Sequence, residues 1–371
     1  MKILHLTDHY LPVLGGIETH VAALAARQAA RGDEVTVLTS TPSSAEGRHC
    51  DDAGPVVVTR VPSVFEGVRI DFTAYDVVHA HVSVIATFSA PLASLARRQG
   101  VPTVVTVHSL WNGLGPIPAA AASLAGLRRA PVLWTAVSRV AAEQLRSRLP
   151  GRPHVPVLPN AVEVAPRAGS PRGEAGKPVR LVSTMRIARR KRPLPLLAMF
   201  DLLSRSTTAP VELTIVGDGP LRPRLERRLR NTSLRGSVTV TGRLDPDEVL
   251  RTLTEADLYV APAVLESFGL AALEARCVGL PVVGHAASGM TDFVRDGVEG
   301  CLCDSDVEMV ERLRQLVDDA TLRHRISEHN RTAPSALTWQ NAMAHNDAAY
   351  DLAHAEVRTS GRHALKAALD G

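Results

Sequence analysis

Residues 264–275 read Val-Leu-Glu-Ser-Phe-Gly-Leu-Ala-Ala-Leu-Glu-Ala. The apolar run that precedes them, at 257–262, ends in proline and is typical of a buried strand. After them, apolar residues recur at helical spacing as far as Gly279. The stretch therefore predicts a strand that feeds a short helix, with Glu266 in the connecting loop and Glu274 inside the helix.

This predicted loop has features that suit a sugar nucleotide. Ser267, Phe268 and Gly269 are expected to open the helix with backbone N–H groups that lack an acceptor within the helix, and such groups bind anions. The carboxylates of Glu266 and Glu274 would accept hydrogen bonds from ribose and sugar hydroxyls. Two Glu residues at this spacing also occur at the start of ordinary solvated helices, so the spacing alone leaves that alternative open.

The composition favours a two-domain globular protein. A chain of 371 residues is long for one core and suits two domains of roughly 150–200 residues each. Hydrophobic residues make up 45%, and no apolar run reaches the ~18 residues of a membrane span. The N-terminus turns polar too early for a signal peptide, and four cysteines without framework spacing indicate a reducing, cytoplasmic compartment. Cys301 and Cys303 lie in an apolar run and are predicted to be core thiols rather than a metal pair.

The net charge of +4 is concentrated in two basic segments, at 186–192 and 222–230. The second has one leucine stripe and predicts an amphipathic helix, which is usually a solvated surface helix. Peripheral contact with an anionic membrane, at its inner face, is the alternative for this helix. Nucleic-acid binding is not expected, because no recognised module or aromatic interleaving is present.

Strands and helices alternate through residues 1–163. A strand at 3–6, a helix from Gly16 and a strand at 35–38 form the first unit, whose paired glycines allow phosphate to approach the backbone or make a plain turn. The spacing is neither a dinucleotide fingerprint nor a P-loop. Further strands are predicted at 55–61, 75–80, 102–107, 132–135 and 155–158, and helices near 84–98, 119–129 and 139–149. This alternation favours a parallel sheet covered on both faces.

A second alternation occupies residues 178–333, after a stretch at 164–177 that has the composition of a linker. A strand at 179–183 is followed by Arg186 and Lys191, which either face solvent or meet a diphosphate. A strand at 211–216 runs into a glycine turn containing Gly217 and Gly219, and Arg243 follows a strand at 237–241. The last predicted helix spans 334–356, and 357–371 form a tail.

Several strings of the chain, in this order, resemble the family 4 retaining glycosyltransferases of the GT-B fold. They are Gly-Gly-Ile-Glu-Thr-His at 15–20, Thr-Val-His-Ser at 106–109, the basic run at 186–192 and the stretch at 264–275. The resemblance implies an α/β fold of two Rossmann-like domains facing a cleft, with the acceptor on the first and the donor on the second. It also implies that the C-terminal helix crosses back to the first domain.

The resemblance also implies roles for individual residues. The catalytic residues would be His108, Glu266, Arg186 and Lys191. Residues that bind the donor would be Gly16, Arg186, Lys191, Gly217, Gly219, Arg243, Glu266, Ser267, Phe268, Gly269, Leu270 and Glu274. His79 and His81 lie in a string that is also similar to the family and are predicted to be scaffold. The chain departs from the family pattern at Ala161, at Glu163 and in the loop 288–294.

The expected reaction is transfer of a hexosyl group from a UDP- or GDP-sugar to a sugar, lipid-linked or small-molecule acceptor, with the anomeric configuration retained. No cofactor is expected, and no metal, because helix capping explains the D-x-D strings at 245–247 and 304–306. Two alternatives stay open. A nucleotide-sugar epimerase shares the architecture, and the altered loops suggest a degenerate, non-catalytic sugar-binding protein.

Overall fold

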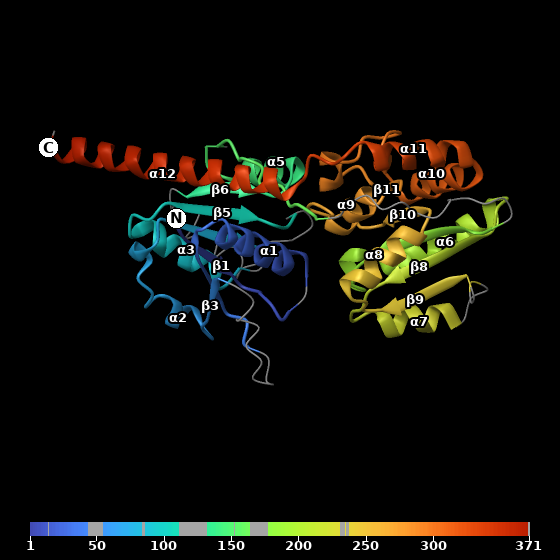
Figure 1. Cartoon of the computed structure of the whole chain (residues 1–371), viewed down its shortest axis with the longest axis horizontal. Coiled ribbons are helices and arrows are strands. Elements are labelled where there is room, and N and C mark those ends of the chain that lie inside the picture. Colours follow the sequence, from blue (N-terminus) through green and yellow to red (C-terminus); the bar gives the residue numbers. More distant parts are fainter. Residues whose placement is uncertain are drawn as a thin grey trace. The chain divides into compact units, whose positions relative to one another are not determined.

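The structure is a computed structural model in which the chain forms two compact units (Figure 1). Unit 1 comprises Met1–Ala161 and Trp339–Gly371, and unit 2 comprises Val162–Thr338. Side chains are described as far as Thr359. The structure describes all residues except Leu14, 44–54, 84–85, 111–131, Arg152, 164–176, 231–233, 235–236 and 370–371.

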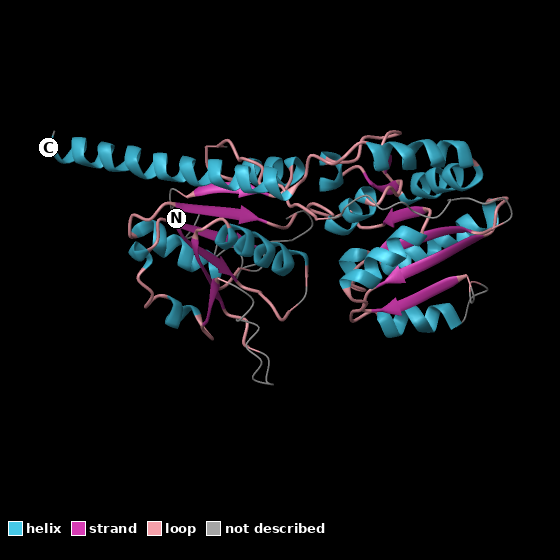
Figure 2. Ribbon diagram, viewed as in Figure 1, coloured by secondary structure: helices cyan, strands magenta, loops and turns pink. Residues whose placement is uncertain are grey.

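Within the described residues, unit 1 holds a six-stranded parallel sheet in the order β3-β2-β1-β4-β5-β6 (Figure 2). The chain order reverses between β1 and β4, which is where ligands bind in sheets of this kind. The strands are β1 (Lys2–Thr7), β2 (Glu34–Thr39), β3 (Val56–Arg60), β4 (Val77–Val82), β5 (Thr103–Val107) and β6 (Leu133–Ala136). The helices are α1 (Gly16–Ala30), α2 (Val64–Gly67), η2 (Phe72–Ala74), α3 (Ser89–Arg98), α5 (Arg139–Arg148) and α12 (Trp339–Leu369).

Among the residues that the structure covers, unit 2 repeats this plan with the order β12-β11-β10-β7-β8-β9. Its chain order reverses between β7 and β10. The strands are β7 (Val179–Thr184), β8 (Val211–Val216), β9 (Val238–Gly242), β10 (Leu258–Ala261), β11 (Val282–His285) and β12 (Gly300–Cys303). The helices are η3 (Arg189–Lys191), α6 (Pro193–Ser206), α7 (Arg222–Arg230), α8 (Pro246–Glu255), α9 (Leu270–Cys277), η4 (Gly289–Asp292), α10 (Asp306–Asp318) and α11 (Ala320–Thr332).

Helices cover both faces of the unit 1 sheet. Alternate strand side chains point to opposite faces, so each strand contributes residues to both clusters. One face packs against α3 and α5, with Leu6 among its buried residues. The other packs against α1 and α12, where Ile3 shares a cluster with Val21 and Tyr350. The C-terminal helix thus belongs to the core of the first unit, which confirms this part of the expected fold.

Three elements differ from the sequence-based prediction. The strand predicted at 155–158 is reduced to one bridge, between Ala136 and Val157, because the neighbouring prolines have no N–H to donate to a ladder. The helix predicted near 84–98 begins at Ser89, where the Asp8 carboxylate accepts from the N–H groups of Phe88 and Ser89. The helix near 119–129 lies outside the described residues.

The third difference is the C-terminal helix, α12 (Trp339–Leu369), which continues beyond its predicted end at 356. The segment predicted as a tail from 357 is therefore helical over most of its length. Its alanine, leucine, lysine and arginine residues are strong helix formers, which explains the extension. Among the described helices, none combines the length and the apolarity needed to cross a membrane.

Two predictions about side-chain burial agree with the structure. Cys301 and Cys303 are buried in β12 as core thiols, and their burial raises the pKa of the Cys301 thiol to about 11. The basic helix α7 buries Leu225 and packs Leu229 against the core of unit 2. Its arginine-rich side is left toward solvent, as expected for a surface helix.

Candidate functional site

In unit 2, the loops after β7 and β10 bring together two of the predicted catalytic residues. Lys191 ends η3, and its ammonium donates a hydrogen bond to the carboxylate of Glu266. The two side chains stay partly open to solvent, with exposed fractions of 39% and 17%. Because the strand order reverses between β7 and β10, this ion pair lies where a doubly wound sheet binds its ligands.

Arg186 is exposed in the loop between β7 and η3. The turn between β8 and α7 holds this loop in place. The N–H of Ile187 donates to the carbonyl of Asp218 over 2.8 Å. Gly217 and Gly219 have φ angles of 133° and 157°, and a Cβ on them would lie 1.9 and 2.6 Å from backbone oxygens of the Arg186 loop. Only glycine fits such an approach, so both residues position the backbone that carries Arg186.

The loop that carries Glu266 differs in one respect from the prediction. Helix α9 begins at Leu270, with Gly269 as its N-cap in the left-handed conformation at φ 96°. Ser267 and Phe268 therefore precede the helix instead of opening it. Phe268 is buried, and its ring lies 5.6 Å from that of Phe293, so its side chain belongs to the core. The first-turn N–H groups available to an anion start at Leu270.

Glu274 lies in α9 and is half-buried. Burial raises the pKa of its carboxyl from 4.5 to about 7, because the charged form loses hydration. The group is therefore close to half ionised at neutral pH. A carboxyl with a pKa near 7 accepts hydrogen bonds from hydroxyls as the anion and donates one bond when protonated.

Arg192 is a residue of the basic run that sequence reasoning did not single out. It has a left-handed backbone, at φ 58°, and its guanidinium donates to both carboxylate oxygens of Asp306, over 2.8 and 2.6 Å. It also donates to the carbonyl of Pro262 over 3.0 Å. Arg192 therefore ties the loops after β7 and β10 to the start of α10. The positive φ of a non-glycine residue costs of order 1–3 kcal/mol, which these bonds offset.

The two D-x-D strings have different structural roles. Asp245 is the N-cap of α8, as predicted, and it also forms a capping box with Glu248. The second string was predicted to cap through its aspartates, but Ser305 is the N-cap of α10 and accepts from the N–H of Glu308. The carboxylate of Asp306 forms an ion pair with Arg192. Arg243, the last predicted contact in unit 2, is exposed directly after β9.

In unit 1, Gly16 is the exposed first residue of α1, and His108 directly follows β5. His108 is buried, and its Nε2 lies 3.0 Å from Nδ1 of His81. Burial, and to a lesser extent the neighbouring His20, lowers the pKa of His108 to about 3. The ring is therefore neutral at pH 7.

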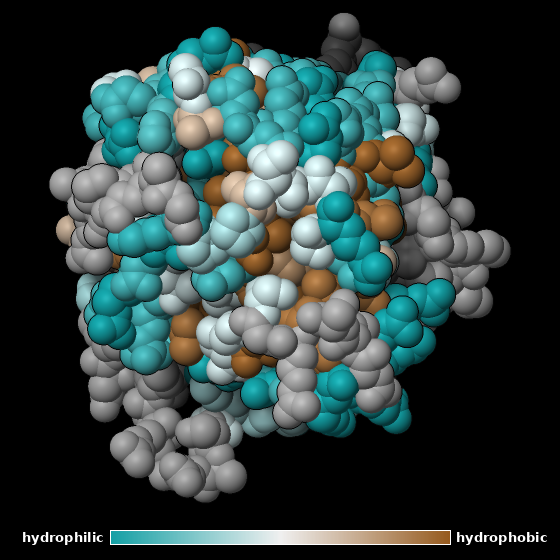
Figure 3. All heavy atoms as spheres, turned by 90° about the vertical axis from the view of Figure 1, so that its right-hand side faces the viewer, coloured by the Kyte–Doolittle hydropathy of each residue, from teal (hydrophilic) through white to brown (hydrophobic). Residues whose placement is uncertain are grey.

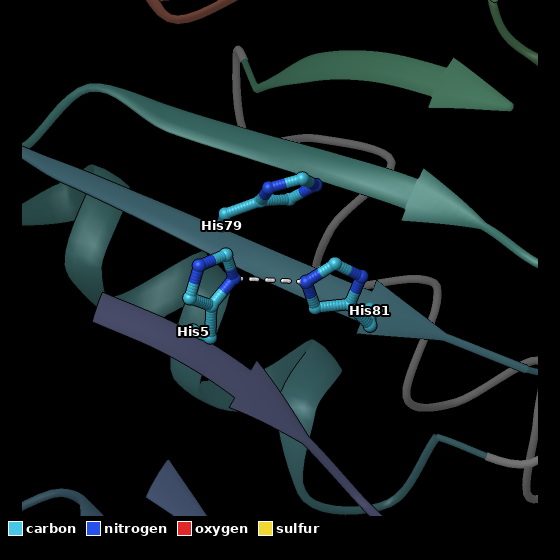
Figure 4. Close-up of side chains that lie close together, drawn as sticks. All are labelled: His5, His79 and His81. Atoms are coloured by element: carbon cyan, nitrogen blue, oxygen red, sulfur yellow. Dashed lines mark hydrogen bonds between the residues drawn. The ribbon is translucent and has the colours of Figure 1, made fainter. Parts of the chain in front are cut away.

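His108 is part of a polar layer on the sheet face that packs against α1 and α12. His5 in β1 lies directly opposite His79 in β4, and His81 lies next to them toward the strand ends. Figure 4 shows the three rings together. The sequence predicted that His79 and His81 belong to the scaffold, and it did not single out His5. The signal that unites them is the two-residue period of the strands, which puts His5, His79 and His81 on one face.

Comparison with known proteins gives consistent results for both units. Residues 14–166 match the family described as Glycosyltransferase Family 4, and residues 170–333 match Glycosyl transferases group 1. The chain is 30% identical over 343 residues to a D-inositol 3-phosphate glycosyltransferase of Rhodococcus jostii, covering 78% of this chain and 74% of the relative. It is 27% identical to a glycogen synthase of Mycobacterium tuberculosis, with 92% of each chain covered.

A solved structure supports the fold. HepE of Anabaena in complex with UDP-glucose superposes with a TM-score of 0.72 at 15% identity, covering 96% of this chain and 100% of that chain. Two six-stranded parallel sheets with helices on both faces, matched over nearly the whole length of a GT-B structure, confirm the predicted fold class. From these matches together, the chain belongs to the family 4 glycosyltransferases and has the GT-B fold.

Proposed function

We propose that the protein transfers a hexosyl group from a UDP- or GDP-sugar to an acceptor hydroxyl, with retention of the anomeric configuration. The observation that carries this proposal is the ion pair of Lys191 and Glu266 at the reversal point of the unit 2 sheet. Lys191 would supply a cation to the leaving diphosphate, and Glu266 beside it would accept hydrogen bonds from sugar hydroxyls. The structural neighbour that holds UDP-glucose supports this donor class.

Each candidate residue has a role in this reaction. Arg186 and Lys191 would neutralise the diphosphate together with the N-terminus of α9 and the backbone at Gly16. Glu274 would bind ribose, and Glu266 and His108 would contact the transferred sugar. The bond between the anomeric carbon and the phosphate oxygen breaks, a bond to the acceptor oxygen forms, and the acceptor hydroxyl gives up its proton.

The proposed reaction needs no divalent metal ion. The carboxylates of Asp245 and Asp306 already have partners in α8 and Arg192. Arg186 and Lys191 supply the positive charge that a magnesium ion would otherwise give to the leaving group. We expect full transferase activity in excess EDTA. Activity that disappears with chelator and returns with magnesium or manganese would contradict this mechanism.

The acceptor, in this proposal, is a sugar, a lipid-linked sugar or a small molecule. The exposed arginines of α7, Arg227 and Arg228, border a groove with Leu202, whose exposed fraction is 59%. Figure 3, which looks onto unit 2, shows apolar residues exposed among hydrophilic ones. These features support peripheral contact with an anionic membrane surface, which co-sedimentation with anionic and with neutral vesicles would measure.

Incubation with labelled nucleotide sugars tests the proposed function. Label that moves to an acceptor, with retained configuration by NMR, supports it. Isomerised donor would instead indicate an epimerase, and unchanged donor with binding alone would indicate a non-catalytic sugar-binding protein. A thermal-shift panel of nucleotide sugars, run first, selects the base and the sugar for this assay.

A further inference from the structure

The guanidinium of Arg192 spans the carboxyl ends of four neighbouring strands in unit 2. Arg192 lies in the connection after β7, and the sheet continues from β7 through β10 and β11 to β12. Its Nη1 lies 3.0 Å from the carbonyl oxygen of Pro262, after β10, and 3.1 Å from Nε2 of His285, at the end of β11. It also lies 2.8 Å from Oδ1 of Asp306, in the helix that follows β12. One side chain therefore connects all four strand ends.

The direction of each of these hydrogen bonds follows from the chemistry of arginine. A guanidinium stays protonated and only donates, so Pro262, His285 and Asp306 all accept. Nε2 of His285 must then carry a lone pair. Burial, and to a lesser extent the charge of Arg192, lowers the pKa of His285, which keeps the ring neutral. The hydrogen bond from Arg192 also lowers the pKa of the Asp306 carboxyl, so the acid stays ionised.

Arg192 and Asp306 form an ion pair of the kind that fixes the position of its partners. Most exposed ion pairs contribute little, unless they are bidentate or belong to a network. This pair is bidentate, with distances of 2.8 and 2.6 Å, and the exposed fraction of the Arg192 side chain is 24%. The carbonyl of Pro262 and the buried ring of His285 extend the pair into a network. We call these four residues the Arg192 clamp.

The Arg192 clamp adjoins the two candidate residues that form an ion pair with each other. Lys191 directly precedes Arg192 in the chain, and Glu266 lies in the loop after β10. The clamp holds the first carbonyl of that loop, at Pro262. Farther along, the carbonyl of Glu266 accepts from the N–H of Gly289 over 2.8 Å. The loop that carries Glu266 is therefore tied at its start by the clamp and at its middle by Gly289.

We infer that Arg192 is a positioning residue, which places Lys191 for the diphosphate and Glu266 for the transferred sugar. It does so by joining the connections after β7 and β10, with Asp306 as its anchor. This role rests on the proposed function of Lys191 and Glu266. Adjacent cations of the basic run thus have different tasks. The charge of Arg192 is balanced inside the protein by Asp306, and the more exposed Lys191 remains for the donor.

Arg192→Gly separates the clamp from the backbone turn at this position. Glycine adopts the φ of 58° at no steric cost, so this variant loses the guanidinium and can keep the turn. Arg314→Ala is the matched control, because Arg314 also donates two hydrogen bonds to one carboxylate, that of Glu311, but both residues lie in α10. Arg192→Lys is a second test variant, which keeps the positive charge and loses the planar fork.

Hydrogen exchange on the full chain measures the clamp without reference to activity. The amide of Gly289 reports on the Glu266 loop, because it donates to the carbonyl of Glu266. We expect this amide to exchange faster in Arg192→Gly than in the wild type, since the loop has lost the tie at its start. Exchange in Arg314→Ala should match the wild type. An unchanged Gly289 amide in Arg192→Gly would overturn the inference.

Steady-state kinetics connect the clamp to turnover. Arg192→Gly is expected to lower kcat ~10- to 100-fold, because small displacements of positioned groups have effects of this size. The donor KM should change little, since the diphosphate still meets the charge of Lys191. Arg192→Lys should recover only part of kcat, because an ammonium cannot reproduce the planar fork. Wild-type kcat in both Arg192 variants would show that the clamp does not position the site.

A double-mutant cycle distinguishes positioning from a general loss of stability. If Arg192 acts through Lys191, adding Arg192→Gly to Lys191→Ala should lower kcat much less than the same change does in the wild type. Losses that multiply independently would contradict the positioning role. A wild type without transferase activity, in which Gly289 exchange still responds to Arg192→Gly, would refute the proposed function and leave the clamp confirmed.

Discussion

His108, the candidate catalytic residue of unit 1, is buried and neutral, whereas the candidate catalytic residues of unit 2 are charged and partly open to water. His108 lies in the core beside His20 and His81, and burial lowers the pKa of all three rings. Lys191 and Glu266 form an ion pair, and Arg186 is exposed. His108 follows β5 and Arg186, Lys191 and Glu266 follow β7 and β10, so residues beyond the carboxyl ends of parallel strands have two kinds of electrostatic environment in this fold.

The two environments would bind a ligand through different interactions. In unit 2 the positive charge attracts an anionic diphosphate, and solvent and salt weaken this attraction. In unit 1 the buried histidines carry no charge. The positions of their hydrogen-bond donors and acceptors, rather than electrostatic attraction, therefore decide what they bind. The two units should therefore respond differently to pH, to salt and to substitution.

The largest expected difference is in acid stability. Among its described residues, unit 1 buries five histidines, His5, His20, His79, His81 and His108. Burial lowers the pKa of His5 and His20 from 6.5 to about 4 and that of His108 to about 3, and it holds the pKa values of His79 and His81 well below 6.5. The unfolded chain therefore takes up protons first as the pH falls. Stability is full above pH 6.5 and is lost progressively as the pH falls from there through 4 and below. Near pH 5 the slope would reach ~7 kcal/mol per pH unit for five protons.

Tryptophan fluorescence during urea unfolding at a series of pH values measures this slope, because Trp111, Trp134 and Trp339 all belong to unit 1. Hydrogen exchange follows unit 2 in the same samples. His20→Gln should reduce the slope by about one proton, and the exposed His9→Gln should not change it. A fluorescence transition with no pH dependence between 6.5 and 4.5 would refute the assignment of neutral histidines.

The next effect concerns the charged residues of unit 2. Replacing Lys191 or Arg186 with alanine is expected to lower kcat by ~10²- to 10³-fold or more, because the developing charge on the diphosphate loses a cation. Arg189→Ala is the control, since Arg189 is an exposed neighbour in the same basic run. Steady-state kinetics in low and high salt should show the donor KM of the wild type rising with ionic strength. Wild-type turnover in Lys191→Ala would contradict the role of Lys191 in stabilising the leaving diphosphate.

A smaller effect is expected at the neutral histidine of unit 1. His108→Ala should lower turnover by ~10²-fold while donor affinity, measured by calorimetry, stays close to that of the wild type. The reason is that His108 belongs to the unit proposed to hold the acceptor, whereas the nucleotide is assigned to unit 2. If this variant transfers sugar at the wild-type rate, His108 is a core histidine without a role in the reaction.

The parallel fold followed from local patterns, whereas the candidate site residues came from the resemblance to a known family. Alternation of strands and helices predicted both sheets, and the Asp-Pro-Asp-Glu string predicted Asp245 as a helix N-cap. The hydrogen bonds among the buried side chains of unit 1 did not follow, because they depend on strand order and on Gln28 meeting Tyr350, 322 residues away. Nor could the sequence tell which arginine of the basic run pairs with Asp306. That choice depends on the left-handed backbone of Arg192.

The smallest expected effect concerns Glu274. Its contribution to the free energy of unfolding falls as the pH rises, whereas that of the buried histidines falls as the pH decreases. Burial raises the pKa of this carboxyl from 4.5 to about 7, so the folded protein holds a proton that the unfolded chain has lost in this range. The stability that it contributes is full below pH 4.5 and lost as the pH rises through 7. Glu274→Gln should therefore match the wild type in free energy of unfolding near pH 4.5 and exceed it by at most ~3 kcal/mol at pH 8.

Donor binding by Glu274 should follow the same ionisation. The carboxylate accepts two hydrogen bonds from ribose hydroxyls and the protonated acid loses part of that capacity, so wild-type donor affinity should rise with pH around 7. Glu274→Ala should weaken binding by ~1–3 kcal/mol and slow turnover less, since ribose lies away from the bond that breaks. Calorimetry between pH 6 and 8 measures both quantities. A variant that keeps donor affinity but loses turnover would move Glu274 from the ribose to the reacting sugar.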